Sequence, residues 1–322
     1  MSGQKVEIDN DQSEAFKEAI EDDVDSEEVF EVTPEELSLI RADLACEFPD
    51  EYDYLSDAYI LSVASKPYSK DPTVRRPIEY TMEKLRAVMT WREEAGAPAL
   101  EDWIKLANGP TDAPEAVENP AAFTKAKALA NSLNYGSMYW HGLDKKGRPI
   151  LWIRTNRMPW YPDVEAQVNA LMVLADAGIK LMPKDITDFV VISDSNSPPP
   201  PNPSFMINLL NALVKGYPDR LNLLVSVPVG SIIQFVMGLL TPLMPSRLAS
   251  KLVLISKEDA ESKLCSILEN GIDDIPTFLE GKCDHDKLYP ADGVNRGQGN
   301  LKFDYYGMVD RLQAKFKEFA QK

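Results

Sequence analysis

Few side chains in this 322-residue sequence have the types needed for acid–base or metal chemistry. It holds two histidines, His141 and His285, and three widely separated cysteines, Cys46, Cys265 and Cys283. His285 stands in a Cys-Asp-His-Asp sequence, but no second pair of ligands follows at the spacing of a zinc motif, so a surface turn is the preferred interpretation. Cysteines this few and this far apart predict reduced thiols and a cytoplasmic location rather than a disulfide framework.

The common catalytic fingerprints are also missing from the sequence. It contains neither the G-x-S-x-G nucleophile elbow nor the G-x-G-x-x-G dinucleotide loop. The glycine-bounded segment 142–147 lacks the Lys-Ser/Thr ending of a phosphate loop and indicates a turn before a strand. We therefore expect a protein that is not an enzyme and needs no cofactor or metal. A lipid hydrolase stays as an alternative, provided that a serine, a histidine and an acid meet in space.

The most informative segment is apolar rather than catalytic. The 26 positions from Leu221 to Ser246 carry no charged residue, a length that would allow a membrane span. Pro228, Pro242 and Pro245 interrupt it, which favours a strand, a turn and a short helix instead.

Residues 231–244, placed on a helix, are apolar nearly all the way round. One side holds Ile232, Phe235, Val236, Leu239 and Leu243, and another holds Ile233, Met237, Leu240 and Met244. Such a helix must be covered on both faces. A central core helix meets that condition, and so does a helix between an internal apolar cavity and a bilayer.

The elements around this helix alternate between strand and helix patterns. Strand-like runs occur at 150–154, 189–193, 221–227 and 252–255, with helical patterns at 164–182, 203–215, 231–240 and 257–270. Strands separated by helices predict crossover connections and a mostly parallel mixed sheet flanked by helices, an α/β fold.

Helical patterns also lie at both ends of the chain. Thr33, Pro34 and Glu36 form a helix start with a capping box, and further helices are expected at 55–64, 78–94 and 304–320. The proline-rich segment 108–120 is expected to link an N-terminal helical module to the main domain. We divide the chain into an acidic, partly disordered segment 1–50, a helical module 51–108, a main domain 124–287 and a C-terminal extension 288–322.

Charge is distributed unevenly along the chain. The net charge is −17, and residues 1–50 alone hold 17 acidic and 3 basic side chains. An acidic chain argues against DNA or RNA as a partner. The nearly neutral remainder is compatible with transient contact with a membrane surface.

Several motifs in order resemble the CRAL-TRIO lipid-binding family, to which the secretory phosphatidylinositol- and phosphatidylcholine-transfer proteins belong. The resemblance covers about residues 55–285. The matching segments are Asp144–Ile150 ("D-x-x-G-R-P"), Phe189–Asp194 (a strand ending in Asp), Gly216–Leu221 ("Y-P-E-R"), Val225–Pro228, Leu243–Pro245, Ser250–Leu254 and Ile275–Gly281.

The resemblance implies a hydrophobic lipid pocket lined by the sheet and closed by the 231–244 helix, which acts as a gate at the membrane. The residues expected at the cavity and gate are Ile192, Leu224, Val227, Ile232, Phe235, Val236, Met237, Leu239 and Leu240.

The resemblance also implies a headgroup site. In family members that bind phosphatidylinositol, the acid of "Y-P-E-R" and a lysine after the gate contact the inositol phosphate. Here Asp219, with its neighbour Arg220, and Lys251 occupy those positions, and the basic residue of the family's N-terminal module falls near Ala64 or Lys66. A purely structural Asp219–Lys251 ion pair is the alternative. The family's threonine before the lysine is Leu248 here, so the resemblance implies lipid binding more strongly than it implies phosphatidylinositol.

Together these observations predict a monomeric carrier that holds one phospholipid, with phosphatidylinositol as the specific candidate. It would act in the cytoplasm and touch membranes peripherally to transfer or present its lipid. An adaptor of the same fold, acting through protein partners recruited by the acidic N-terminus or the Pro198–Pro201 loop, is the alternative.

Overall fold

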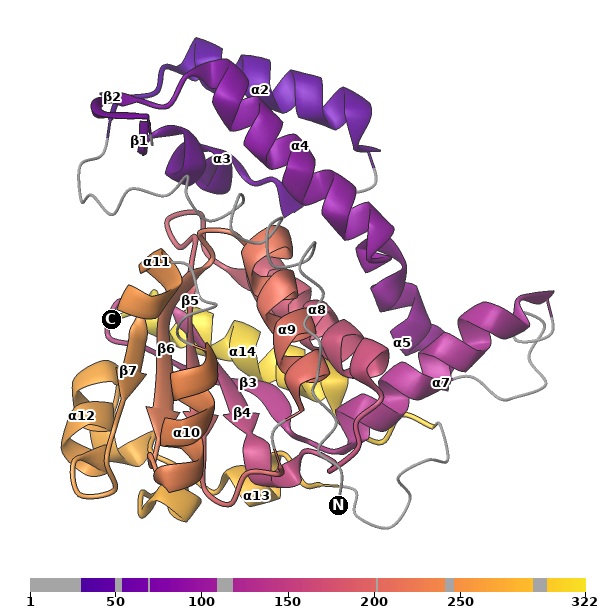
Figure 1. Cartoon of the computed structure of the whole chain (residues 1–322), viewed down its shortest axis with the longest axis vertical. Coiled ribbons are helices and arrows are strands. Elements are labelled where there is room, and N and C mark those ends of the chain that lie inside the picture. The colour runs from indigo at the N-terminus through magenta and orange to yellow at the C-terminus, as the bar shows by residue number, and fades with distance from the viewer. Residues whose placement is uncertain are drawn as a thin grey trace, which may run out of the picture.

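The computed structural model describes residues 30–49, 54–68, 70–108, 118–200, 202–240, 246–291 and 300–322. Its centre is a five-stranded sheet with helices around it (Figure 1). The strands are β3 (Met138–Leu143), β4 (Pro149–Arg154), β5 (Phe189–Asp194), β6 (Leu221–Val227) and β7 (Leu252–Leu254).

The strands lie in the order β3-β4-β5-β6-β7. β3 and β4 are antiparallel and the remaining pairs are parallel, which confirms the expected mostly parallel mixed sheet. β3 was not among the predicted strands, since no element was assigned to the residues before the 142–147 turn. The helices of this domain are α7 (Pro120–Asn134), α8 (Val164–Leu181), α9 (Pro203–Asn211), α10 (Ser231–Leu240), α11 (Ser246–Ser250), α12 (Ala260–Ile267), α13 (His285–Leu288) and α14 (Tyr305–Phe319).

Strand register divides the sheet into two faces, because successive side chains of a strand point to opposite sides. The α8 face carries Trp140, Leu151, Val191 and Leu224. The indole of Trp140 donates to the carbonyl of Leu174 in α8, which packs that helix onto this side.

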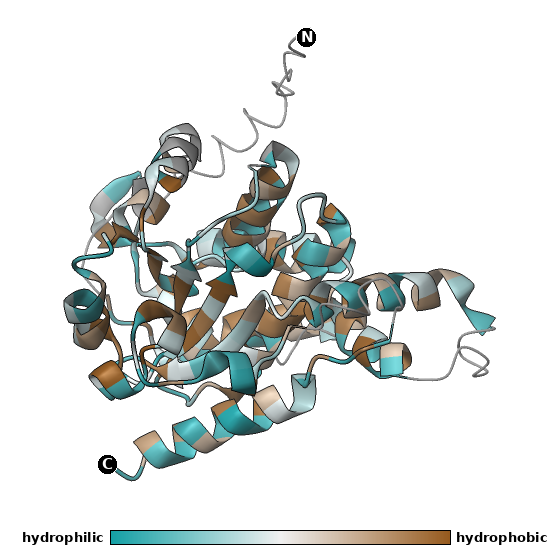
Figure 2. Ribbon diagram, turned by 90° about the horizontal axis from the view of Figure 1, so that it is seen from below, coloured by the Kyte–Doolittle hydropathy of each residue, from teal (hydrophilic) through white to brown (hydrophobic). Residues whose placement is uncertain are grey.

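The other side, the α13 face, carries Tyr139, Trp152, Ile192 and Val225. The segment that contains α13 covers it: the Trp152 ring lies 5.0 Å from the ring of His285, edge to face. Figure 2 shows hydrophobic strands at the centre of the molecule and helices of mixed hydropathy around them.

The described N-terminal region before α7 holds the helices α2 (Pro34–Glu47), α3 (Asp57–Ala64), α4 (Ile78–Glu94) and α5 (Leu100–Asn108). They are joined by a short antiparallel pair, β1 (Pro67–Tyr68) and β2 (Asp71–Arg75). The predicted capping box at the start of α2 is present, since the Thr33 side chain accepts from the Glu36 amide and Glu36 accepts from the Thr33 amide. Helix α5 ends at Asn108 and α7 starts at Pro120, the two ends of the segment expected to be a linker, and residues 109–117 lie outside the described part of the structure.

The N-terminal helices share their core with the sheet domain. Buried side chains form one continuous cluster from Ile40 in α2 to Phe316 in α14. At the contact between α4 and the turn after α9, a Cβ on Gly216 would lie 2.2 Å from the Trp91 ring, so only glycine permits this approach. The helical module is therefore docked as a structural part of the domain.

The C-terminal helix α14 packs against the edge strand β3 and against α8. The Trp140 amide of β3 donates to the Met308 sulfur at 3.4 Å, and the Phe319 ring lies against Gly147 in the turn after β3. Among the described helices, none has the length and apolarity to cross a membrane.

Candidate functional site

An ion pair joins the N-terminal helices to the start of β6. The ammonium of Lys66 lies 2.5 Å from Oδ1 of Asp219. The Asp219 side chain is almost wholly buried, with 3% exposed, and that of Lys66 is 21% exposed. Asp219 has a positive φ of 62°, a conformation that Asp tolerates better than most residues. The structure thus brings the acid of the "Y-P-E-R"-like motif to the lysine that the sequence placed only loosely.

Three tyrosine hydroxyls hold the loop that carries Asp219. Tyr54 donates to the carbonyl of Gly216 at 2.8 Å, and Tyr59 donates to that of Pro218 at 2.9 Å. The hydroxyl of Tyr217, in the loop itself, reaches the Asp176 carboxylate in α8 at 2.8 Å. The loop is therefore fixed from two sides before any ligand arrives. Nothing in the sequence pattern marked Tyr54 and Tyr59 for this role, since the fold alone brings them there.

Lys251 approaches the same loop from the opposite direction. It precedes β7, and its ammonium lies 2.5 Å from the carbonyl of Leu221, two residues after Asp219. The two ammonium groups and the carboxylate of Asp219 sum to a formal charge of +1, the sign that attracts a phosphodiester. Lys66 thus forms an ion pair with Asp219, the residue that the alternative interpretation paired with Lys251.

Arg220 has a different environment from its neighbour Asp219. It is 1% exposed, its guanidinium stacks 3.5 Å from the Tyr59 ring, and it donates to the carbonyls of Tyr54 and Thr187 at 3.0 Å each. Protein groups contact this planar guanidinium on three sides, so the role of Arg220 is to stabilise the fold. We therefore leave Arg220 out of the proposed headgroup site.

The expected gate corresponds to helix α10, which covers Ser231–Leu240 as predicted. Ile233 is buried, Met237 is half-buried, and Gln234 and Gly238 are exposed. The side chains of five predicted gate residues lie outside the described part of the structure: Ile232, Phe235, Val236, Leu239 and Leu240. Residues 241–245 also lie outside it.

The predicted cavity residues of the sheet divide between its two faces. Leu224 is half-buried on the α8 face. Ile192 and Val227 are fully buried on the α13 face. The three therefore cannot line one cavity on one side of the sheet.

An apolar pocket of about 130 Å³ lies beside α10. Ile233 of α10, Phe205 and Met206 of α9, and the loop before α8 with Trp160 form its walls. The Pro198–Pro200 part of the polyproline loop lies against it as well. Trp160 is 68% exposed and the next residue, Tyr161, 91% exposed, so large aromatic side chains project into solvent next to the gate.

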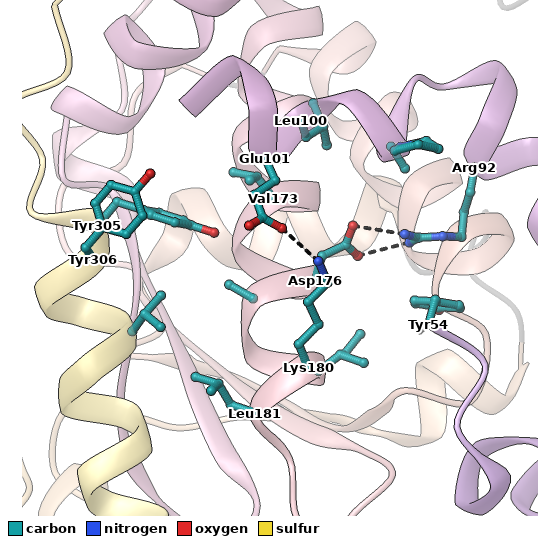
Figure 3. Close-up of a pocket in the computed structure, with 15 residues that line it drawn as sticks. Tyr54, Arg92, Leu100, Glu101, Val173, Asp176, Lys180, Leu181, Tyr305 and Tyr306 are labelled. Atoms are coloured by element: carbon teal, nitrogen blue, oxygen red, sulfur yellow. Dashed lines mark hydrogen bonds and ion pairs between the residues drawn. The ribbon is translucent and has the colours of Figure 1, made fainter. Parts of the chain in front are cut away.

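A second pocket, of about 340 Å³, lies between α4, α5, α8 and α14 (Figure 3). Its charged groups pair with one another: Arg92 binds Asp176 with two bonds of 3.0 and 2.9 Å, and Lys180 binds Glu101 at 2.8 Å. These pairs connect the N-terminal helices to α8. We interpret them as interface contacts rather than as a ligand site.

The described residues do not bring a hydrolase triad together. The closest thiol–imidazole pair is Cys283 with His141, at 3.3 Å. Burial raises the pKa of the Cys283 thiol and lowers the pKa of His141 to about 4, so the pair is neutral and lacks a thiolate nucleophile. Ser195 and Ser226, joined at 2.6 Å, lie at the ends of β5 and β6, away from the histidines.

His285 also corrects a sequence expectation. It was predicted to lie in a surface turn, yet it is fully buried beneath the sheet. The aromatic side chains of strands β3 and β4 cover it. These strands lie far from residue 285 in the sequence, so the local sequence pattern gives no sign of this contact.

The comparisons with known proteins agree with this architecture. The family profile described as CRAL/TRIO domain matches residues 133–281. Residues 133–281 are thus a CRAL/TRIO domain, as the sequence motifs indicated. The domain covers the whole sheet, the Asp219 loop, α10 and Lys251. No curated protein sequence matches the chain. Among solved structures, the crystal structure of Sfh5 is similar, with a TM-score of 0.45 and 12% identity over 80% of this chain and 85% of that one.

Proposed function

We propose that this CRAL/TRIO protein binds one phospholipid in an apolar cavity closed by α10 and transfers or presents it between membranes. The observation that supports this most directly is the Lys66–Asp219 ion pair, with the Lys251 ammonium on the Leu221 carbonyl two residues further on, in a CRAL/TRIO domain that also holds the apolar helix α10. A polar site for a headgroup beside a cover for acyl chains is the arrangement that an amphipathic lipid requires.

The physical benefit of such a cavity is large. A free two-chain phospholipid that enters water exposes its methylenes at about 0.8 kcal/mol each, roughly 20 kcal/mol or more in total. Spontaneous desorption from a bilayer is therefore very slow. A protein cavity that covers the chains offsets most of that cost and leaves the headgroup to determine selectivity.

The headgroup proposal uses Lys66, Asp219 and Lys251. The lysines provide charge-assisted bonds to a phosphate, and the Asp219 carboxylate accepts bonds from sugar hydroxyls. This combination favours an inositol phospholipid over choline, whose trimethylammonium group offers no hydroxyl. On entry the headgroup would exchange part of the Lys66–Asp219 contact for its own.

The membrane contact is proposed at α10 and the adjacent aromatic loop. Trp160 and Tyr161 are exposed on the loop that shares a pocket with Ile233 of α10. Tryptophan and tyrosine favour the interface between headgroups and acyl chains. A bilayer that receives these side chains would lie directly over the gate.

The adaptor alternative rests on the Pro198–Pro200 segment, whose extended prolines suit proline-reading modules. Here, however, the segment packs against an apolar pocket of its own chain, which favours a structural role.

Organic extraction of the purified protein followed by mass spectrometry tests the proposal. A carrier yields about one lipid per chain and moves labelled phospholipid between liposomes. An empty protein that neither loads nor transfers lipid would refute the carrier function and support the adaptor.

A further inference from the structure

The two histidines of the chain and one of its three cysteines meet in a single cluster away from the proposed lipid site. One ligand atom each from His141, Cys283 and His285 lies within 4.8 Å of the others. The rings of the two histidines are 4.4 Å apart, and Nε2 of His141 is 3.3 Å from the Cys283 sulfur. Residues 141 and 283 are 142 positions apart, so the fold and not a local motif assembles the cluster.

The backbone around the cluster is fixed. His141 belongs to β3, which is paired with β4. Cys283 forms a bridge with Pro276, its amide donates to Ile275 and its carbonyl accepts from Thr277. The three side chains are thus held by a strand and a bonded turn rather than by a loose loop.

Each histidine has its Nδ1 atom bound to a tyrosine hydroxyl at 3.1 Å: Tyr289 for His141 and Tyr139 for His285. The Tyr289 hydroxyl also donates its proton to the carbonyl of Trp140, so His141 must donate from Nδ1 and keep a lone pair on Nε2. That lone pair points at Cys283. A ligating histidine in a metal site has the same arrangement, with one nitrogen oriented by an oxygen and the other free to bind.

The Nε2 atom of His285 provides an independent observation. It is fully buried and has no hydrogen-bond partner among the described residues. A buried polar atom left unsatisfied costs about 1–3 kcal/mol, and such atoms in native structures call for an explanation. Coordination to a metal ion would satisfy it.

We propose that His141, Cys283 and His285 bind a transition-metal ion of the zinc type. Two imidazole nitrogens and one thiolate form a borderline-soft ligand set that suits Zn²⁺ and disfavours Mg²⁺ and Ca²⁺, which require oxygen ligands. A fourth position remains for water or another ligand. Binding converts the Cys283 thiol and M²⁺ into a metal thiolate and releases one proton to solvent.

The surroundings fit a partly accessible site. His141 and Cys283 are half-buried and offer an approach from solvent, while Trp152 and Phe278 enclose His285. Burial lowers the pKa of His141 to about 4 and that of His285 to about 2, so both imidazoles are neutral, the form that binds metal.

Cobalt(II) is the probe for the test, because its thiolate complexes absorb in the near ultraviolet and tetrahedral Co²⁺ absorbs in the visible region. Metal-stripped full-length protein is titrated with Co²⁺. We expect both absorptions to saturate at one equivalent and to disappear when Zn²⁺ is added.

Cys283→Ser changes one atom and should abolish the charge-transfer band and weaken Co²⁺ binding at least ten-fold. Cys265→Ser, which alters a half-buried cysteine of α12, is the matched control and should bind Co²⁺ like the unmodified protein. Tyr289→Phe should weaken binding about ten-fold while the thiolate band remains.

A protein that shows no cobalt–thiolate band, or a band that persists in folded Cys283→Ser, overturns the proposal. The cluster would then be a neutral thiol–imidazole contact of the core. Circular dichroism of each variant distinguishes lost binding from lost folding. The readout does not involve lipid, so the result is independent of the proposed transfer function.

Discussion

Lys66 and Asp219 are 153 residues apart in sequence and 2.5 Å apart in space, and their contact connects the N-terminal helices to the loop before β6. Lys251 binds the carbonyl of Leu221, the residue at which β6 begins directly after that loop. Residues that are far apart in the sequence thus contribute to the proposed headgroup site.

Replacing either lysine with alanine tests headgroup selection. We expect Lys66→Ala and Lys251→Ala each to lower phosphatidylinositol uptake about ten-fold, the loss of roughly one charge-assisted hydrogen bond. Phosphatidylcholine uptake in the same liposome assay should change little. Lys282→Ala, which alters an exposed lysine paired with Asp273, is the control. Equal losses for both lipids would remove the headgroup role of these lysines.

A charge on the gate should block exchange. Phe235→Asp is expected to reduce transfer between liposomes by at least ten-fold, because burying a carboxylate in acyl chains or in an apolar cavity is very costly. Gln234→Asp places the same charge on the neighbouring exposed position of α10 and should preserve transfer. Comparable transfer rates in the two variants would contradict the gate assignment.

The aromatic loop should contribute to membrane contact. The double variant Trp160→Ala, Tyr161→Ala removes two exposed rings and is expected to reduce sedimentation with phospholipid vesicles several-fold, since neither ring packs in the core. Tyr306→Ala, at an exposed ring on α14, serves as the control. If the double variant sediments normally, the bilayer meets another surface.

Arg220 should matter for stability rather than for lipid selection. Arg220→Ala removes two hydrogen bonds to carbonyls and the stacking on Tyr59, and it leaves a cavity. We expect the free energy of unfolding in urea to fall by about 3 kcal/mol. Arg86→Ala, at a solvent-exposed ion-pair residue of α4, should leave the free energy of unfolding nearly unchanged. A selective loss of phosphatidylinositol binding in stable Arg220→Ala would return this residue to the headgroup site.

The Arg92–Asp176 pair should couple α4 to α8. Arg92 is 2% exposed, so a double-mutant cycle with Arg92→Ala and Asp176→Ala is expected to give a coupling free energy of about 1–3 kcal/mol. The measurement is urea unfolding of the four proteins. Additive single effects would show that this ion pair does not couple the two helices.

The sequence was most informative where structure is local. The capping box at Thr33, the extent of α10 and the strands that became β4, β5 and β6 follow from side-chain periodicity over a few residues. β3 was not predicted: its residues are buried on both faces, so the strand lacks the alternation of polar and apolar side chains that marks a half-exposed strand.

Features that depend on contacts between residues far apart in the sequence could not be predicted from the local sequence pattern. Periodicity did not show that Ile192 and Leu224 lie on opposite faces, because that depends on how β5 and β6 register. The assembly of His141 with Cys283 and His285 depends on the same tertiary pairing. Arg220 looked like a ligand contact from its motif, and only the positions of Tyr54 and Tyr59 show it as an anchor.

The helix α14 lies along β3, an outermost strand whose unpaired backbone groups would otherwise offer a template to other chains. The Met308 sulfur accepts from one of those amides, and Phe319 closes over the turn at Gly147. β7, the strand at the opposite edge of the sheet, is only three residues long. A chain truncated before Tyr305 would therefore polymerise by pairing β3 with strands of other molecules. By covering this edge, α14 protects the protein from aggregation.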